Sequence, residues 1–310
     1  MKRFQNILTC VDTLAQEHWA LQWASKLARQ TGAKLHLVDV LPDFAWLVRA
    51  TLPNLQHVYD LMLAEKRAKL NAVAESIRAE GLAATWNVLT GRTSTEVIRE
   101  AQRREHDLVV RTAKGPRSRQ SGFLGTTSTR LLRKCPCPVW IVKPGESPAF
   151  KHVMAAVDAG PVDAPHFTLS KQILELGKSI CELEQGKLSV VHAWELYAED
   201  VLLSRMSPEE VQELKEKMKA GVEESLDRLL SAYQMSVSDD NVHILHGEVG
   251  ASIVHFAKEH DVDMVVMGTV ARSGISGLLM GNTAEHILSR IECSLLALKP
   301  DDLISPIPLE

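Results

Sequence analysis

The sequence predicts an α/β protein made of two tandem domains, each a five-stranded parallel sheet with helices on both faces. Three observations support this fold class. Short apolar runs alternate with amphipathic segments five times in the first half of the 310-residue chain. The same alternation then starts again, and several residues recur in the second half at a constant separation. An alternation of strand and helix requires parallel strands joined by crossover helices.

The first half contains five predicted strands and four helical segments. Short, continuous apolar runs are typical of strands that are covered on both faces. We place these strands at residues 7–11, 35–41, 85–89, 108–110 and 139–142. One helix ends at Gly32, and a long helix runs from about Leu55 to Ala79 after a break at Pro53. Thr93 and Glu96 have the spacing of a capping box before the next helix.

The second half repeats this order. We place its strands at residues 153–157, 188–193, 242–245, 264–267 and 295–298. Its longest helix is expected to start with Ser207 as N-cap and Pro208 as the first helical residue. Matching Asp, Gly, Cys and Lys residues, each pair 156 positions apart, are Asp107/Asp263, Gly125/Gly281, Cys137/Cys293 and Lys143/Lys299. A repeat this long is a duplicated domain, so we divide the chain into residues 1–147 and 148–310.

Both halves place an aspartate directly after the first strand and a glycine-containing loop after the fourth. The aspartates are Asp12 and Asp158, and the second-half loop runs from Gly268 to Gly281-Asn282 at the start of a helix. Ligands of parallel sheets bind beyond the carboxyl ends of the strands, where the strand order reverses. A helix N-terminus also attracts anions such as phosphate. We therefore expect these groups to converge on a phosphate-type site.

In these residues the chain resembles the universal stress protein family. Its nucleotide-binding members have an aspartate after strand one and a Gly-x2-Gly, nine-residue, Gly-Ser/Thr loop after strand four. The second half has Gly268-x2-Ala271, nine residues and Gly281-Asn282, and the first has Thr112-x2-Gly115, nine residues and Gly125-Thr126. The tandem E-type members are the most similar, because residues 131–140 and 281–285 are characteristic of them.

The resemblance covers nearly the whole chain. It implies a Rossmann-like (adenine nucleotide alpha hydrolase-like) fold with strand order 3-2-1-4-5 in each domain. It also implies that domains pair through their fifth strands, that the protein has a regulatory or protective role under stress, and that it has no defined catalytic activity.

Both halves depart from the nucleotide-binding pattern, so we expect ATP or another nucleotide to bind weakly or not at all. The first half has Thr112 in place of a glycine, and a β-branched residue is costly wherever the backbone needs positive φ. We therefore favour the second half, in which Thr283 is a possible hydroxyl donor. The candidate ligand-contacting residues of both halves are Asp158, Gly268, Ala271, Gly281, Asn282, Thr283, Asp12, Gly115, Gly125 and Thr126.

Each of these residues also has an ordinary structural role. The glycines suit turns, Asn282 suits an N-cap with Glu285 three residues later, and both aspartates suit caps of the following helices. Residues 108–145 hold eight basic residues and no acidic one, which suits phosphate or RNA but also a solvated surface. Since the net charge is -4, we expect no nucleic-acid partner.

No metal site is predicted. His243 and His246 are three residues apart on a predicted strand, so their side chains point to opposite faces. Cys135-Pro-Cys137 has the spacing of a redox pair or of half a metal site. Because no second Cys or His pair lies nearby in the sequence, we expect these thiols to be structural.

We expect a non-enzymatic, cytoplasmic stress-response factor with a degenerate nucleotide-type site. No apolar segment is long enough for a membrane span, no secretory signal follows the initial basic pair, and no nucleophile elbow, full Walker loop or HExxH motif is present. Two alternatives stay open. One is a nucleotide switch or hydrolase, and the other is a carrier of a small apolar molecule, suggested by the apolar-rich helices at 55–79 and 208–232.

The two predicted fifth strands, Val139–Val142 and Leu295–Leu298, are apolar throughout. An exposed apolar edge strand promotes aggregation, and pairing removes the exposed edge. We therefore expect the two domains to form an intramolecular pseudo-dimer through these strands, and a homodimer of the whole chain is compatible with this arrangement.

Overall fold

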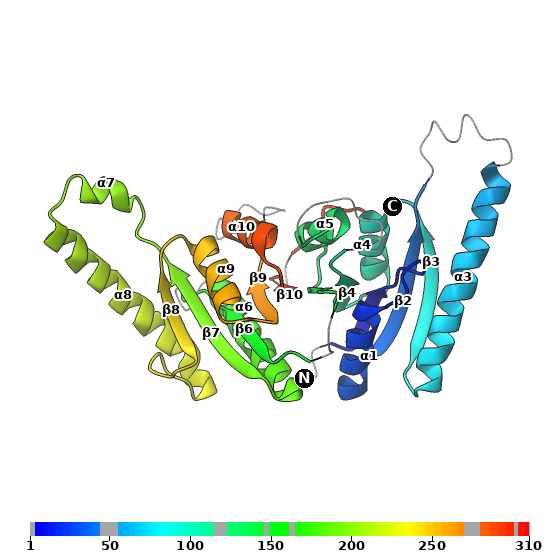
Figure 1. The fold of residues 1–310 in the computed structure, drawn as a ribbon, viewed down its shortest axis with the longest axis horizontal. Coiled ribbons are helices and arrows are strands. Elements are labelled where there is room, and N and C mark those ends of the chain that lie inside the picture. Colours follow the sequence, from blue (N-terminus) through cyan, green and yellow to red (C-terminus); the bar gives the residue numbers. More distant parts are fainter. Residues whose placement is uncertain are drawn as a thin grey trace. The chain divides into compact units, whose positions relative to one another are not determined.

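A computed structural model describes residues 4–43, 55–114, 123–145, 149–160, 165–269, 280–300 and 303–309. Its backbone contacts divide the chain into two compact units. The first unit contains Met1–Pro148, Ile275–Leu279 and Ser294–Glu310, and the second contains Ala149–Gly274 and Met280–Cys293. The family-like alternation of strand and helix is present in each unit (Figure 1).

The sheet of the first unit has the predicted parallel order β3-β2-β1-β4-β5. Its strands are β1 (Asn6–Cys10), β2 (Lys34–Leu41), β3 (Ala84–Thr90), β4 (Leu108–Thr112) and β5 (Val139–Val142). Most residues of β1, β2, β4 and β5 are buried, as expected for strands with helices on both faces. The sequence prediction of fold class and strand order is confirmed for this unit.

Four described helices cover this sheet: α1 (Trp19–Thr31), α3 (Leu55–Ala79), α4 (Thr93–Arg103) and α5 (Thr126–Lys134). Helix α1 ends at Gly32, whose φ of 75° is the left-handed conformation that favours glycine. Helix α3 has the predicted bounds and buries Leu70, Ala74 and Ile77. Helix α4 packs beside α5 and contacts β2 and β3, and α1 and α3 also contact the strands. The predicted break at Pro53 lies outside the described residues.

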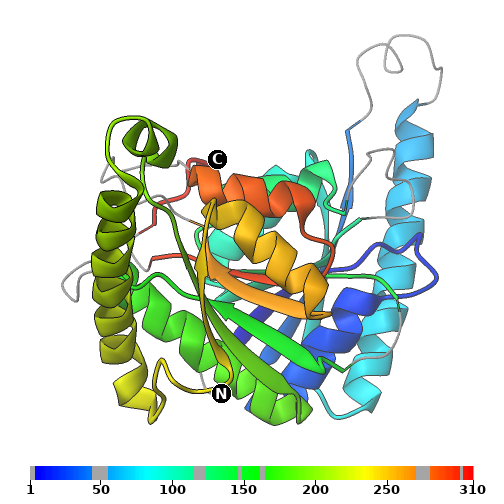
Figure 2. The same ribbon diagram turned by 60° about the vertical axis from the view of Figure 1, so that its left-hand side comes forward.

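The second unit has the same arrangement, with parallel order β8-β7-β6-β9. Its strands are β6 (His152–Ala156), β7 (Lys187–Trp194), β8 (Val242–His246) and β9 (Met264–Gly268). Its helices are α6 (Pro165–Glu184), α7 (Glu199–Leu203), α8 (Pro208–Leu230), α9 (Val249–Glu259) and α10 (Asn282–Arg290), with a short 3-10 turn at Ser231–Tyr233. Helix α9 packs beside α10 and α6 beside α8, so helices cover both faces (Figure 2).

Helix α8 begins as the sequence predicts. The Ser207 side chain accepts a hydrogen bond from the Glu210 N–H, the Glu210 carboxylate accepts one from the Ser207 N–H, and Pro208 is the first helical residue. The capping box predicted for α4 is wrong, because the N-cap there is Arg92 and Thr93 already lies inside the helix. Likewise the N-cap of α10 is Gly281, and Asn282 is its first helical residue rather than its cap.

The last strand of the chain, β10 (Ser294–Leu298), belongs to the first unit by its contacts. It runs antiparallel to β5, with Leu296 opposite Trp140. The segment that follows is also tied to this unit, since Arg99 and Arg103 of α4 donate to the carbonyl oxygens of Pro308 and Leu309 at 3.1 and 3.0 Å. Among the described residues, no helix has the length and apolar character that a membrane crossing requires.

Candidate functional site

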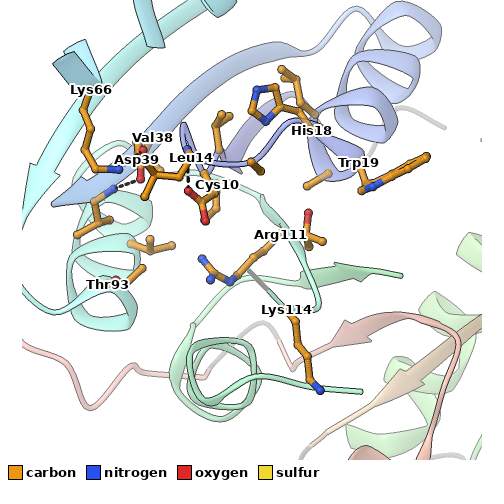
Figure 3. Close-up of a pocket in the computed structure, with 18 of the residues that line it drawn as sticks. Cys10, Leu14, His18, Trp19, Val38, Asp39, Lys66, Thr93, Arg111 and Lys114 are labelled. Carbon is orange, nitrogen blue, oxygen red and sulfur yellow. Dashed lines mark hydrogen bonds and ion pairs between the residues drawn. The ribbon is translucent and has the colours of Figure 1, made fainter. Parts of the chain in front are cut away.

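A cavity of about 810 Å³ lies in the first unit at the carboxyl ends of β1, β2 and β4 (Figure 3). Residues directly after β1, the end of β2 and the end of β4 line it, together with residues of α3 and α4. The strand order reverses at β1, which has β2 on one side and β4 on the other. This is the position at which parallel α/β sheets bind ligands.

Polar side chains on one wall of the cavity form a buried ion pair. Lys66 of α3 contacts the carboxylate of Asp39 in β2, and both side chains are about nine-tenths buried. The Thr13 hydroxyl and backbone N–H donate to the same carboxylate oxygen at 2.6 and 3.0 Å. The other oxygen accepts the Val40 N–H at 2.7 Å. The Lys66 amine thus compensates the charge of the Asp39 carboxylate, and the Thr13 hydrogen bonds hold the loop after β1 against β2.

Arg111 of β4 lies in the middle of the cavity (Figure 3). Its guanidinium group acts on the thiol of Cys10, the last residue of β1. Burial raises the pKa of Cys10 to about 11, and the charge and hydrogen bond of Arg111 oppose that rise. The Nε atom of Arg111 is buried and has no hydrogen-bond partner among the described residues. Because a buried guanidinium donor without an acceptor is costly, this atom suits an anionic or carbonyl-bearing ligand.

Asp12 lines the same cavity, with Glu17 and His18. Its carboxylate accepts the Leu14 N–H at 3.0 Å, which is a local turn two residues on. It does not cap α1, because the N-cap of that helix is His18 and no side chain caps it. The structure therefore brings Asp12 to the cavity, and its alternative interpretation as a helix cap is wrong.

The predicted glycine loop of the first half is only partly described. Thr112 and Lys114 line the cavity, whereas Gly115 lies outside the described residues. Gly125 is the N-cap of α5, and its N–H donates to the Ala113 carbonyl at 3.0 Å. Thr126 is the first residue of α5, and neither it nor Gly125 is among the residues that line the cavity.

In the second unit, Gly268 ends β9 and packs closely against a helix. A Cβ atom at this position would lie 2.7 Å from Cδ2 of Leu169 and 3.7 Å from Cδ1 of Ile173, both on α6. Its φ is not in the left-handed region. A Cβ atom here would force the end of the Leu169 side chain to shift, so the close packing of α6 favours glycine at this position without a ligand.

Two of the remaining second-half candidates, Asp158 and Gly281, have local hydrogen-bond partners. The N–H of Asp158 donates to the Ser170 hydroxyl at 2.9 Å, and that hydroxyl donates back to the Asp158 carbonyl at 2.9 Å. The Gly281 N–H donates to the Thr269 carbonyl at 3.3 Å. Thr283 lies in the first turn of α10, and Ala271 lies outside the described residues. The contact of these residues with a ligand stays a prediction.

The two repeats differ in the charge they carry at this edge of the sheet. Arg111 and Cys10 of the first repeat correspond to the apolar residues Met267 and Ala156 of the second. Asp39 corresponds to His192, since Lys34 and Lys187 start the matching strands. The ring Nδ1 of His192 is already within 3.0 Å of the Val157 carbonyl oxygen. At these three positions, the charged residues Arg111 and Asp39 therefore occur in the first repeat and not in the second.

Asp39 and Lys66 were not among the residues selected from the sequence, although a signal for them exists. Asp39 interrupts the apolar run of β2, and Lys66 stands four residues before Leu70 on the buried stripe of α3. Opposite charges that each occupy a position expected to be apolar indicate a buried ion pair.

The two histidines of β8 lie in separate clusters. His243 packs on the Phe256 ring at 4.7 Å between ring centres, whereas His246 packs on Trp194 at 4.6 Å and lies 3.4 Å from the Glu199 carboxylate. Within the described part of the chain, no three His, Cys, Asp or Glu residues are grouped so that they would hold a metal ion.

Comparisons with known proteins agree with the architecture. The sequence profile of the universal stress protein family matches residues 3–143 and 149–299. Universal stress protein E of Escherichia coli K12 is 26% identical over 315 residues, which is 100% of this chain and 98% of that protein. A protein of unknown function from Pseudomonas aeruginosa PAO1 has a crystal structure with a TM-score of 0.77 and 27% identity, covering 97% of this chain and 95% of that one.

The structure of a universal stress protein from Archaeoglobus fulgidus has a TM-score of 0.63 at 19% identity over 95% of this chain and 98% of that one, so it supports the fold alone. The family profile accounts for both repeats and leaves only short segments of the chain unmatched. The chain therefore belongs to the universal stress protein family, with two tandem copies of the family's domain.

Proposed function

We propose that this protein is a non-enzymatic stress-response factor of the cytoplasm whose first domain binds a nucleotide or a similar anionic ligand with modest affinity. The observation that carries the proposal is Arg111, whose buried Nε lacks a partner inside a cavity at the switch point of the sheet. Lys114 and Thr112 line the same cavity and give it a second positive charge and a hydroxyl group. A phosphate or a carboxylate satisfies such donors.

This proposal moves the site from the second half, favoured by the sequence pattern, to the first. Two observations support the move. The apolar Met267 and Ala156 replace Arg111 and Cys10 in the second repeat, and Gly268 is explained by its contact with Leu169. The site stays degenerate relative to the family pattern, since Thr112 stands where a glycine is expected.

Isothermal titration calorimetry of the full chain with ATP tests the proposal. We expect binding that Arg111→Gln weakens by about 10- to 100-fold, because a charge-assisted hydrogen bond contributes about 1.5–3 kcal/mol. Lys217→Met is the matched control, since it removes one positive charge from an exposed position of α8. Absence of ATP binding, or equal binding by the wild type and Arg111→Gln, would contradict the assignment.

The same protein samples decide between the other functions. Release of phosphate from ATP, abolished by Arg111→Gln, would replace the non-enzymatic proposal by a hydrolase. If the second domain holds the nucleotide instead, Ala271→Gly combined with Asn282→Ser should strengthen ATP binding by about tenfold or more, which is about 1.4 kcal/mol. Arg111→Gln would then have no effect on ATP affinity.

A carrier of a small apolar molecule is the second candidate. It is favoured by Val58, Leu61 and Met62 on the first turns of α3, which are 44%, 57% and 38% exposed. Met62 also lines the cavity, beside Leu41 and Pro42. Exposed apolar side chains next to a cavity are typical of sites that take apolar ligands. Native mass spectrometry of freshly purified protein tests this function, and Met62→Glu should abolish retention of such a ligand.

We also propose that the two repeats associate through their fifth strands within one chain. The β5–β10 ladder supports this, since both strands are almost completely buried and pair antiparallel. Residues 1–147 expressed alone lack β10 and should self-associate or aggregate through β5. A soluble monomer of that fragment at high concentration would remove the physical basis for the pairing.

A further inference from the structure

The first unit contains two cysteines in direct contact outside the cavity. Cys135 is the C-cap of α5, and its N–H donates to the Leu131 carbonyl at 2.9 Å. Cys137 lies two residues later, just before β5. The two Sγ atoms are 3.5 Å apart and share a hydrogen bond. Cys135 is fully buried and Cys137 is half-buried, so solvent reaches the pair through Cys137.

A buried cation stands beside this pair. Lys299, which follows β10, is 3% exposed and donates a hydrogen bond to the Leu132 carbonyl at the end of α5. Burial lowers the pKa of Lys299 to about 8, and the charges of the two cysteines act in the opposite direction. The amine therefore remains mostly protonated at neutral pH and stabilises a negative charge on the sulfur atoms.

The hydrogen bond between the thiols divides their acidity. It holds the pKa of Cys135 below the usual thiol value, because a thiolate at that position accepts the Cys137 S–H, and Lys299 contributes in the same direction. The same hydrogen bond, together with burial, raises the pKa of Cys137. The first proton of the pair is thus lost easily and the second is retained. One thiolate beside one thiol is the protonation state that thiol oxidation requires.

We propose that Cys135 and Cys137 form an oxidisable dithiol that a peroxide converts into an intramolecular disulfide. The proton shared by the two sulfurs moves to Cys135, and the Cys137 thiolate attacks the peroxide. An S–O bond forms as the O–O bond breaks, and hydroxide leaves. The Cys135 sulfur then attacks the Cys137 sulfur, so that an S–S bond forms, the S–O bond breaks and water leaves. Two electrons pass to the peroxide, and the products are one disulfide, one water and one hydroxide, which takes up the proton that the pair lost on ionisation and becomes a second water.

The second repeat shows that the fold itself does not demand this constellation. At the matching positions it has Ile291 in place of Cys135 and Cys293 in place of Cys137. Ile291 is the C-cap of α10 and makes the same backbone bond, to Ile287 at 2.8 Å. Lys299 follows the fifth strand of the second repeat, and the lysine at the same position of the first repeat is Lys143, which is exposed. An apolar C-cap and an exposed lysine satisfy the fold, so the paired thiols and the buried amine are distinctive of the first unit.

The test is oxidation of the reduced full-length protein with hydrogen peroxide. After the reaction is stopped, the free thiols are alkylated with N-ethylmaleimide in denaturant and counted by intact-mass spectrometry. We expect two fewer alkylated thiols than in the untreated protein. Peptide mapping should find the new bond between Cys135 and Cys137, and dithiothreitol should restore both thiols.

Variants of the two repeats provide matched controls. In Cys137→Ser, peroxide should no longer remove two thiols together from the alkylation count. In Cys293→Ser, peroxide should still remove two. Lys299→Met should slow disulfide formation about tenfold at pH 7, the effect of a one-unit rise in thiol pKa, and Lys143→Met should not. If Lys299→Met does not fold, the two serine variants decide.

Three results would overturn the proposal. These are full alkylation of all cysteines after peroxide treatment, a disulfide between other cysteines, and oxidation of Cys137 to the sulfinic acid without disulfide formation. None of these results bears on ligand binding in the Arg111 cavity, so the dithiol and the proposed function are tested separately.

Discussion

The ion pair between Lys66 and Asp39 gives a sharp test of the energetics of the cavity wall. Asp39→Leu removes the carboxylate and leaves the Lys66 amine with only the Thr13 hydroxyl, at 3.3 Å, among its described partners. A charge buried without its counter-ion costs about 3–5 kcal/mol. In a unit of about 150 residues, this corresponds to a fall in the melting temperature on the order of 10 °C.

The other members of the cycle should behave differently. After Lys66→Met, Asp39 keeps the hydrogen bonds from Thr13 and Val40, so we expect a smaller loss of about 1–3 kcal/mol. The double variant Asp39→Leu/Lys66→Met replaces the pair by apolar side chains and should be within about 1 kcal/mol of the wild type, or more stable. The double variant should therefore lose much less stability than the sum of the losses of the two single variants, and this difference is the coupling energy of the pair.

Differential scanning calorimetry of the full chain measures these shifts for the transition that moves. The control is Lys69→Met, three residues along α3, whose pair with Glu65 is exposed and should contribute little to stability. The reasoning would be refuted if Asp39→Leu cost no more than Lys69→Met, or if the double variant were less stable than both single variants.

Two further predictions concern a glycine and a histidine. Gly268→Ala should destabilise the second unit by about 1–3 kcal/mol in urea unfolding because its Cβ meets Leu169, whereas Gly221→Ala, which meets nothing within 4 Å in α8, should stabilise by about 0.5–1 kcal/mol. An unchanged stability of Gly268→Ala would contradict the packing explanation. Burial lowers the pKa of His106, which stacks on His36, to about 4. Above pH 6.5 the histidine is neutral in both the folded and the unfolded state. Between about pH 6.5 and 4 only the unfolded chain binds the proton, so the free energy of unfolding decreases as the pH is lowered. His106→Gln should therefore lose about 2 kcal/mol less than the wild type between pH 7 and pH 5, and equal losses would contradict this account.

Much of the fold follows from local patterns in the sequence. Apolar runs such as Val139–Val142 are strands because both of their faces are covered, and the bounds of α3 follow from its amphipathic period. The parallel topology follows from the alternation of strand and helix. Capping at Thr93 was predicted wrongly, because spacing alone does not decide which of two adjacent residues has the extended backbone of an N-cap.

The site was harder to predict, because its essential contacts are between residues far apart in the sequence. The sequence pattern predicts Asp12, which does line the cavity. It does not predict Arg111, because the interaction of Arg111 with the Cys10 thiol joins residues about 100 positions apart. Gly268 has the sequence context of a ligand loop, yet its lack of a side chain is explained by Leu169 on another element. A glycine that is needed for its backbone conformation and one that is needed for close packing cannot be distinguished from the sequence alone.

The position of β10 has a consequence for protein synthesis. The first unit takes its sixth strand from residues 294–298, although its fifth strand ends at Val142. At a translation rate of about 5–20 residues per second, the apolar edge of β5 waits roughly 8–30 s on the ribosome before its partner strand emerges. During that interval the nascent chain exposes a strand edge that can pair with another nascent chain. Chaperone demand should therefore depend on the second half of the message, and codon changes that slow translation after residue 150 should lower the soluble yield of the whole protein.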